Sequence, residues 1–450
     1  MGSFIFAAAH AHVPISSPAQ GSFLSPTALS MFGLVDGNNF YASCERVFNP
    51  ALREEPIVIL SNNDGCCIAR ADQAKRLGVK MGQPIHEVQP HIRRQLRIFS
   101  ANFGLYGDLS GRVVSVLREW FSRVEVYSID ESFVTFDGVP ADQREAMARQ
   151  ARAQILQWVG IPCCVGIGPT KTLAKLANKL AKKTAHGVVT ALPGSPELET
   201  FPVEDVWGVG RKLTAKLGAE GILTAADLAR ADPDTLRARY GVTLARTQRE
   251  LQGVVCSDLE EVEPERQQIV VSRSFGQEVT SLDDLQQAVS TFAQRACEKL
   301  RARSLQAGGV WVWLNTNPFK PGAAQYHPSK AFNFIGPTSD TREVLLVAQG
   351  LAKAMWKTGY RYKKAGVGLL DLTHGDVQQG DLFAGIDPRS QALMKVMDQA
   401  NAKFGRGTMG MASSAWRTKG PALAKPLWAM NQKNLSPAYT TRWDQLVRVR

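Results

Sequence analysis

Apolar and polar residues follow the periods of strands and helices over about 150 residues after Met31. Helical spacing of apolar residues occupies 109–121 and 147–158, and another helix is expected over 169–183. Apolar runs typical of strands occur at FGLVD (32–36), PIVIL (56–60), VEVYSI (124–129), SFVTF (132–136) and CCVGIG (163–168). With PIVIL set aside as an insertion, the order is β-α-β-β-α-β. This order predicts a split βαβ fold, an antiparallel sheet with two helices on one face.

The remainder of the chain changes character twice. From about Pro202 the pattern is one of short helices separated by glycines. A second α/β region begins at QQIVVSRSF (267–275), continues through a helix over 285–303 and reaches a strand at VWVWLN (310–315). The last seventy or so residues have weak periodicity, and no fold is predicted for them. A chain of 450 residues is expected to form about three domains.

Charge and cysteine content narrow the function classes. The chain carries 53 Lys and Arg against 41 Asp and Glu, a formal charge of +12, which favours a polyanionic partner, nucleic acid before a membrane surface. Seven cysteines without CxxC spacing indicate buried free thiols and a reducing cytoplasm. No apolar run approaches the ~20 residues of a membrane helix. Residues 1–30 contain no Lys, Arg, Asp or Glu, so we interpret them as a disordered leader or a mis-assigned start ahead of Met31.

Two adjacent carboxylates interrupt the strand pattern in VYSIDESF (126–133). Asp130 and Glu131 are expected at a hairpin tip or bulge, where the alternation of side chains relaxes. In the split βαβ fold the end of the first strand brings Asp36 beside them. Three close carboxylates require a cation, and two Mg²⁺ ions about 3.5–4 Å apart would suit in-line phosphoryl transfer. The alternative is a solvated hairpin tip without function.

Several neighbouring residues extend this hypothesis, each with a structural alternative. Phe40 and Tyr41 follow Asp36, and a tyrosine there can pack under a deoxyribose; the alternative is a pair of core aromatics. Arg70, Lys75 and Arg76 are expected on a short helix that could bind a triphosphate, or on an ordinary solvated face. In the predicted helix over 169–183 the cationic positions recur every four residues, as Lys171, Lys175 and Lys179. That face favours anions, although many surface helices share the pattern.

Residues 206–229 (VWGVGRKLTAKLGAEGILTAADLA) resemble a helix-hairpin-helix motif. The glycine-rich turn would let backbone N–H groups reach a DNA phosphate without reading sequence. The residues proposed for this contact are Gly208, Gly210 and Lys212. A purely structural helical turn is the alternative.

These motifs together resemble the Y-family DNA polymerases, over roughly Met31 to Leu372. The resemblance rests on DGNNFYASCE, SNNDGCCIARADQAKRLGVKMG, VYSIDESF, GIGPTKTLAKLANK and the helix-hairpin-helix, in the family's order. The SNNDGC version and the C-terminal extension are closer to the UmuC branch, the catalytic subunit of DNA polymerase V, than to the stand-alone DinB branch. The resemblance implies an α+β multidomain fold: a ferredoxin-like palm (31–39 and 102–192), fingers (40–101), a helical thumb (193–265), an α+β little finger (266–376) and a clamp- and partner-binding region (377–450).

The resemblance also implies roles for individual residues in error-prone synthesis past damaged template. The acids Asp36, Asp130 and Glu131 would be catalytic, and with the Gly37 carbonyl they would hold two Mg²⁺ ions. Tyr41 matches the steric gate against ribonucleotides. The nucleotide-binding positions are Phe40, Tyr41, Arg70, Lys75 and Lys175, of which Lys75 and Lys175 match triphosphate ligands.

A further motif, QGDLF, resembles the peptide that binds the bacterial sliding clamp. Its residues Gln379, Asp381, Leu382 and Phe383 would supply a polar anchor and two apolar side chains for a pocket. The C-terminal region, with Trp416, Trp428 and Trp443, implies a UmuD-like subunit and a RecA filament as partners. The expected location is the bacterial cytoplasm, at the nucleoid. The alternatives are a DinB-type polymerase, a non-catalytic DNA- or clamp-binding scaffold, and a nucleotide cyclase, which would need neither the helix-hairpin-helix nor QGDLF.

Overall fold

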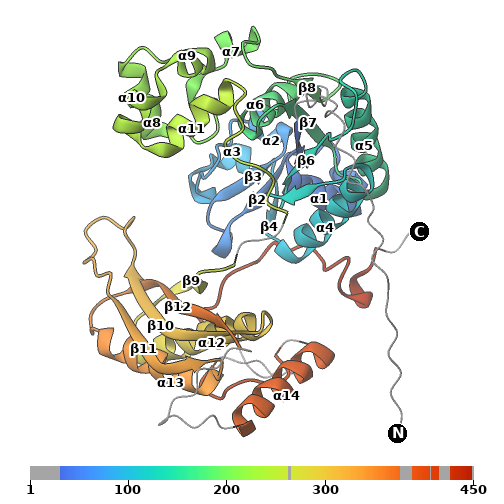
Figure 1. Cartoon of the computed structure of the whole chain (residues 1–450). Coiled ribbons are helices and arrows are strands. Elements are labelled where there is room, and N and C mark those ends of the chain that lie inside the picture. The colour runs from blue at the N-terminus through green and yellow to red at the C-terminus, as the bar shows by residue number, and fades with distance from the viewer. Residues whose placement is uncertain (1–30, 262–264, 376–387, 406, 415–425, 448–450) are drawn as a thin grey trace, which may run out of the picture.

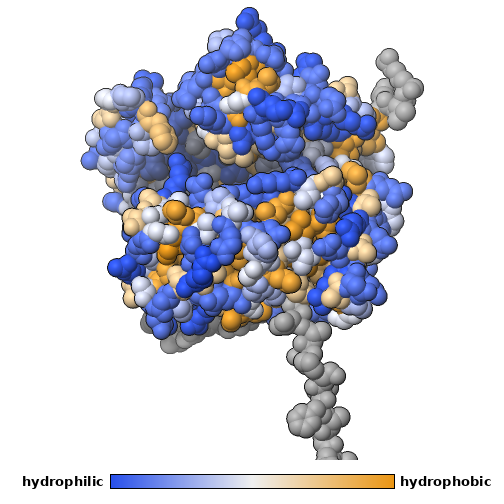
Figure 2. Space-filling model, turned by 90° about the horizontal axis from the view of Figure 1, so that it is seen from above, coloured by the Kyte–Doolittle hydropathy of each residue, from blue (hydrophilic) through white to orange (hydrophobic). Residues whose placement is uncertain are grey.

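The computed structural model describes residues 31–261, 265–375, 388–405, 407–414 and 426–447. Figure 1 shows a five-stranded sheet with its helices, a small three-stranded sheet beside it, a helical region above, and a separate four-stranded sheet below. Hydrophilic residues predominate on the face drawn in Figure 2, and apolar ones form patches among them. Within the described residues, no helix combines the length and the apolarity needed to cross a bilayer. All seven cysteines are free.

The five-stranded sheet has the predicted β-α-β-β-α-β order with one added edge strand. Its spatial order is β5-β6-β1-β7-β8, with β1 antiparallel to both β6 and β7. The strands are β1 (Phe32–Gly37), β5 (Val124–Val126), β6 (Glu131–Thr135), β7 (Cys163–Gly168) and β8 (Val188–Thr190). Helices α1 (Phe40–Phe48), α4 (Phe103–Trp120) and α5 (Arg144–Val159) share a core with one face, around Val35 and Val134. Helix α6 (Lys171–Ala181) covers the other face, where Ala174 meets Leu34 and Phe133.

The three-stranded sheet is the insertion expected from the PIVIL segment. It comprises β2 (Ile57–Leu60), β3 (Cys67–Arg70) and β4 (Arg97–Ser100), in the order β3-β2-β4. The short helices α2 (Asp72–Arg76) and α3 (Pro90–Arg93) complete it, with the 3₁₀ turns η1 (Pro50–Leu52), η2 (Asn62–Asp64) and η3 (Ile85–Glu87) around it. The prediction that Arg70 lies on a helix with Lys75 is wrong: Arg70 ends β3, because the apolar alternation of CIAR lets this segment pair with β2.

The helical region packs around its own apolar core, which includes Leu217, Leu228 and Leu244. It contains α7 (Glu197–Thr200), α8 (Arg211–Ala219), α9 (Ala225–Arg230), α10 (Pro233–Tyr240) and α11 (Val242–Leu251). The helix-hairpin-helix predicted around Gly208 differs from the structure in one respect. The element before the turn is only a 3₁₀ turn, η4 (Val203–Asp205), because Gly208 takes a φ of +89° two residues before the N-cap of α8.

The four-stranded sheet corresponds to the second predicted α/β region. Its order is β11-β10-β12-β9, all antiparallel, built from β9 (Ile269–Val279), β10 (Leu305–Thr316), β11 (Ser329–Thr338) and β12 (Tyr362–His374). Helices α12 (Leu282–Arg301) and α13 (Thr341–Met355) pack on one face. In the segment left without a predicted fold, α14 (Pro388–Phe404) is tied to α12 by an ion pair of 2.6 Å between Arg301 and Asp398, and a 3₁₀ turn, η5, covers Trp443–Gln445.

Helix α6 lies unusually close to β7, and this contact carries a testable prediction. A Cβ atom on Gly166 would lie 2.6 Å from the Asn178 Cα atom, inside the backbone of α6. We therefore expect Gly166→Ala to lower the free energy of unfolding by about 3 kcal/mol, because backbone cannot yield as a side chain does. Denaturant unfolding measures this change.

Gly111→Ala is the matched control, since no atom other than the neighbouring backbone of α4 itself lies within 4 Å of its would-be Cβ in the middle of that helix. It should be neutral or stabilising by up to about 1 kcal/mol. Equal stability of the two variants would contradict the close packing of α6 on β7.

Candidate active site

Three carboxylates meet at one edge of the five-stranded sheet, as the sequence predicted. Asp36 near the end of β1 lies directly opposite Glu131, the first residue of β6. Asp130 lies in the turn before Glu131, and its carbonyl oxygen accepts a hydrogen bond of 2.9 Å from the Gly37 N–H. Cross-strand partners share one face of a sheet, so the register places the Asp36 and Glu131 side chains together, while Asp130 joins them from the turn.

Two lysines, one within α6 and one at its C-cap, neutralise two of these acids. Lys182 donates to Asp36 Oδ2 at 2.7 Å, and Lys175 donates to Glu131 Oε1 at 2.8 Å. The Lys175 ammonium also lies 4.3 Å from the centre of the Tyr127 ring. The third acid, Asp130, accepts a hydrogen bond of 2.6 Å from the Ser128 hydroxyl.

The electrostatics of the cluster favour an added cation. Burial is the main cause that raises the pKa of Asp36 above its usual value. The Lys182 ammonium opposes this shift, and the charges of Glu131 and Asp130 add to it. The three acids therefore repel one another, and positive charge relieves the repulsion.

The donor atoms suit a hard divalent metal ion. Carboxylate oxygens and a backbone carbonyl are the ligands that Mg²⁺ prefers. The two ammonium groups at 2.7 and 2.8 Å show that this edge accepts cations. In the described part of the chain, no group of three or more His, Cys, Asp or Glu side chains is gathered closely enough to hold a metal ion. Metal binding would thus require the three acids to move closer together and the ammonium groups of Lys182 and Lys175 to leave Asp36 and Glu131.

The two aromatics after β1 have different environments. Phe40 is 4% exposed, and its ring fills the space where a Cβ on Gly37 would lie, so it is a core residue. Tyr41 is half-buried and stacks on Tyr106, with ring centres 4.6 Å apart. Burial raises the pKa of Tyr41, and the charge of Asp130 raises it further, which places this ring beside the carboxylates.

The predicted triphosphate ligands also differ in position. Lys75 on α2 donates to Asn39 Oδ1 at 2.6 Å and to Asp72 at 2.9 Å, so it lies beside the turn that follows Asp36 and Gly37. The Arg70 guanidinium instead donates to the Val79 carbonyl at 2.6 Å within the small sheet.

The lysine face of α6 is not the free cationic surface that the four-residue spacing suggested. Lys171 is 3% exposed and donates to Glu125 at 2.6 Å, and Lys179 forms an ion pair with Asp205. Only tertiary packing could reveal these partners, because each acid comes from another element. Lys182, seven residues after Lys175, belongs to the same face and was overlooked.

The turn before α8 leaves three predicted DNA contacts exposed, namely Gly208, Gly210 and Lys212. The first N–H groups of a helix have no acceptor within the helix, so α8 presents donors here. The clamp motif Gln379–Phe383 lies outside the described residues.

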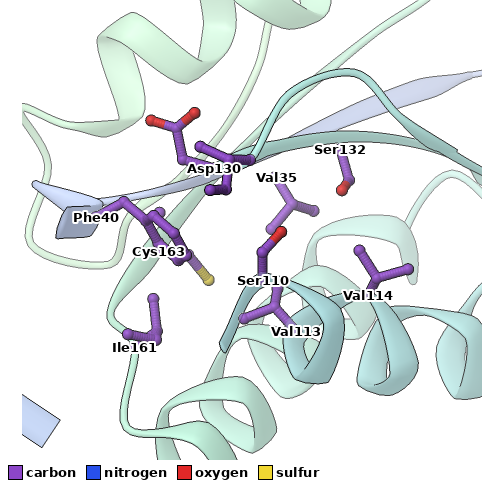
Figure 3. A pocket seen from close by; sticks show the side chains of 11 residues that line it. Val35, Phe40, Ser110, Val113, Val114, Asp130, Ser132, Ile161 and Cys163 are labelled. Carbon is purple, nitrogen blue, oxygen red and sulfur yellow. The ribbon is translucent and has the colours of Figure 1, made fainter. Parts of the chain in front are cut away.

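A cavity of about 10 Å³ lies beneath the carboxylate edge, between β1 and α4. Figure 3 shows the side chains that line it. Val35, Val113 and Ile161 are among its lining residues. The Asp130 carboxylate points away from the apolar side chains that line this cavity. The space is too small for a nucleotide and holds at most a water molecule, so any substrate must lie over the open edge.

Family models match most of the chain. The impB/mucB/samB family matches residues 35–179, its C-terminal domain matches 266–382, and a domain of unknown function (DUF4113) matches 391–449.

Individual relatives agree with these matches. Protein UmuC of Salmonella typhimurium is 43% identical over 430 residues, covering 93% of this chain and 100% of that protein. Protein MucB of Escherichia coli is 42% identical over 425 residues, 92% of this chain and 99% of that one. DNA polymerase IV 1 of Bacillus subtilis is 25% identical over 422 residues, 89% and 98% of the two chains.

Among solved structures, a Y-family DNA polymerase chimera of Dbh and Dpo4 is similar with a TM-score of 0.62 and 19% identity. The match covers 76% of this chain and 99% of the chimera, and it supports the fold alone. The family models and the relatives of 42–43% identity show the family and the type of enzyme. The chain belongs to the impB/mucB/samB family and is a UmuC-type translesion DNA polymerase of the Y family.

Proposed function

We propose that this polymerase adds deoxynucleotides to a primer 3′ end opposite damaged template, with Asp36, Asp130 and Glu131 as its catalytic acids. The observation that carries the proposal is the meeting of these acids at one open sheet edge beside Tyr41. Membership of the Y family implies metal-dependent catalysis, with DNA and deoxynucleoside triphosphates as substrates. Two bound Mg²⁺ ions would supply activation of the primer 3′-oxygen and neutralisation of the triphosphate.

The residues around the acids would orient the nucleotide. Asp36, Asp130, Glu131 and the Gly37 carbonyl would hold the metal ions, and Lys75 and Lys175 would bind the triphosphate. Both lysines already donate to oxygen acceptors beside the acids, Asn39 Oδ1 and Glu131 Oε1.

Three further residues would act on the base and sugar of the nucleotide. The Tyr41 ring would exclude a 2′-hydroxyl, with Phe40 holding the turn beneath it. Arg70 would act from the small sheet, close to the nucleotide or templating base.

The four parts of the molecule would serve as palm, fingers, thumb and little finger. We assign 31–39 and 102–192 to the palm, 40–101 to the fingers, 193–265 to the thumb and 266–376 to the little finger. The exposed turn at Gly208 and Gly210, with Lys212, would bind DNA backbone. The formal charge of +12 supports contact with a polyanion.

Primer extension opposite an abasic site tests the function directly. We expect the full chain with Mg²⁺, sliding clamp, a UmuD-like protein and RecA to insert deoxynucleotides there. Extension without any partner would favour a DinB-type enzyme. Tight primer-template binding with no extension under any of these conditions would favour the scaffold.

The clamp motif gives a separate prediction. Replacing both Leu382 and Phe383 with Ala should abolish the stimulation of synthesis by the sliding clamp, because the two apolar side chains would leave its pocket. Synthesis without the clamp should be unchanged, as measured by primer extension with and without the clamp. Loss of the unstimulated activity would instead assign QGDLF a structural role. The remaining proposed partners are a UmuD-like subunit and the RecA filament, in the bacterial cytoplasm.

A further inference from the structure

The C-terminal segment 426–445, here called the clasp segment, begins on the four-stranded sheet. Its backbone pairs with β9, where the Gly276 N–H donates to the Trp428 carbonyl at 3.0 Å. Trp428 is 7% exposed, packs edge-on against Phe292 and donates from Nε1 to Gln287 at 3.0 Å. Figure 1 shows the segment leaving this sheet and running to the end of β4. One end of the clasp segment is therefore built into the four-stranded sheet.

The SNNDG loop of the small sheet receives the middle of the clasp segment. Asn63 donates through Nδ2 to the Ser274 carbonyl of β9 at 2.8 Å, and its Oδ1 accepts from the Asn431 N–H at 2.9 Å. Asp64 accepts from the Lys433 N–H at 2.7 Å. Asn63 and Asp64 have φ values of 63° and 52°, a conformation that Asn and Asp tolerate better than most residues. This loop thus binds the clasp segment and the four-stranded sheet at once.

Beyond this loop, the clasp segment reaches helices α1 and α4 beneath Tyr41. Ser436 donates to Glu45 Oε1 at 3.0 Å and accepts from Asn102 Nδ2 at 3.0 Å. The same Glu45 oxygen accepts from the Tyr106 hydroxyl at 2.7 Å. Tyr106 is fully buried, and its ring is the one that stacks on Tyr41. Two hydrogen bonds therefore separate the clasp segment from the ring that supports Tyr41.

We propose that the clasp segment docks the four-stranded sheet onto the SNNDG loop, and that Ser436 acts as a positioning residue for Tyr41 through Glu45 and Tyr106. The physical basis is the burial of Glu45, which is 1% exposed. A buried carboxylate that loses one of its donors is costly, so it shifts toward another partner. Such a shift of Glu45 pulls the Tyr106 hydroxyl with it and tilts the ring under Tyr41. The positioning part rests on the proposed function of Tyr41 as the sugar gate, whereas the docking part does not.

Hydrogen exchange of the full chain without DNA tests the docking. Asn63→Gly removes the side chain and keeps the positive φ accessible. We expect peptides from residues 427–436 to exchange about tenfold faster in this variant. Asn62→Gly is the matched control, because Asn62 is the exposed neighbour in the same loop. In the Asn62→Gly protein, the peptides from residues 427–436 should exchange at the wild-type rate. Equal exchange in all three proteins, or equal acceleration by both variants, would overturn the docking.

Sugar selection tests the positioning. We expect Ser436→Ala to lower the discrimination between deoxynucleotide and ribonucleotide, as a ratio of kcat/KM values, about threefold. Tyr106→Phe keeps the ring and loses the hydroxyl, so it should produce a similar change. The double variant should do no more than either single one, because each substitution interrupts the same chain of two hydrogen bonds, Ser436 to Glu45 and Tyr106 to Glu45. Thr441→Ala, exposed and near the end of the segment, should have no effect.

Two outcomes would overturn the positioning proposal. One is that Tyr41→Ala loses the discrimination between deoxynucleotide and ribonucleotide while Ser436→Ala keeps it in full. The other is additive effects in the double variant. If Tyr41→Ala itself left sugar selection unchanged, the gate assignment would fail and the positioning with it, while hydrogen exchange would still decide the docking.

Discussion

Replacing Asp130 with Asn is expected to slow nucleotide addition by about a thousandfold, equivalent to about 4 kcal/mol in the activation barrier. The substitution removes one negative charge from the site proposed to bind Mg²⁺. It keeps the shape of the side chain and an oxygen that can still accept from Ser128 Oγ, now 2.6 Å from Asp130 Oδ1. The fold and the affinity for primer-template should therefore be unchanged. Single-turnover extension measures the rate, and fluorescence anisotropy measures DNA binding.

Asp142→Asn is the matched control for this experiment. Asp142 is an exposed acid of the same part of the chain, in the loop before α5, and its loss should alter neither rate nor binding. Retained activity in Asp130→Asn would exclude Asp130 from the catalytic set. Loss of both activity and DNA binding would mean that the residue acts on structure, because the contacts proposed for DNA, at Gly208, Gly210 and Lys212, do not include Asp130.

Replacing Tyr41 with Ala is expected to raise the relative use of ribonucleotides about a hundredfold, a change of about 2.7 kcal/mol in selectivity. The half-buried ring lies beside Asp130 and is held by the stack on Tyr106, so its removal opens space where a 2′-hydroxyl would otherwise collide. Primer extension with each nucleotide class gives the two kcat/KM values.

Tyr41→Phe serves as the control, since it keeps the ring and should keep the selectivity. Removing an aromatic stack also costs about 1 kcal/mol of stability, so thermal unfolding should accompany the kinetics. Unchanged selectivity in a folded Tyr41→Ala protein would remove the gate role from this residue.

The sequence by itself was sufficient to predict that the three acids lie together at one edge of the sheet. The order of apolar runs predicted β1 beside the hairpin of β5 and β6, and the observed register pairs Asp36 with Glu131. This inference succeeded because strand periodicity and the connectivity of a split βαβ unit restrict the topology before any side chain is placed. The periodicity of 267–315 was similarly sufficient for β9, α12 and β10.

Local sequence patterns gave wrong predictions for residues whose contacts come from other elements of the fold. The four-residue spacing of Lys171 and Lys179 was correct for a helix face, but a face carries no information about what covers it. Acids from β5 and from the helical region bury or pair these lysines. Likewise, Arg70 was expected on a short helix with Lys75, whereas the pairing of CIAR with β2 makes Arg70 the last residue of a strand.

Only the tertiary structure decided the contacts that span the chain. Ser436 and Glu45 are 391 positions apart, and Asn431 and Asn63 are 368 apart. No periodicity links such positions, because their meeting depends on how separately folded sheets pack and on the path of the segment between them. The sequence alone therefore determined the family, the placement of the three acids at one sheet edge and the order of the elements. The clasp segment and the support of Tyr41 followed from packing, since hydrogen bonds between distant segments form only after each part has its own shape.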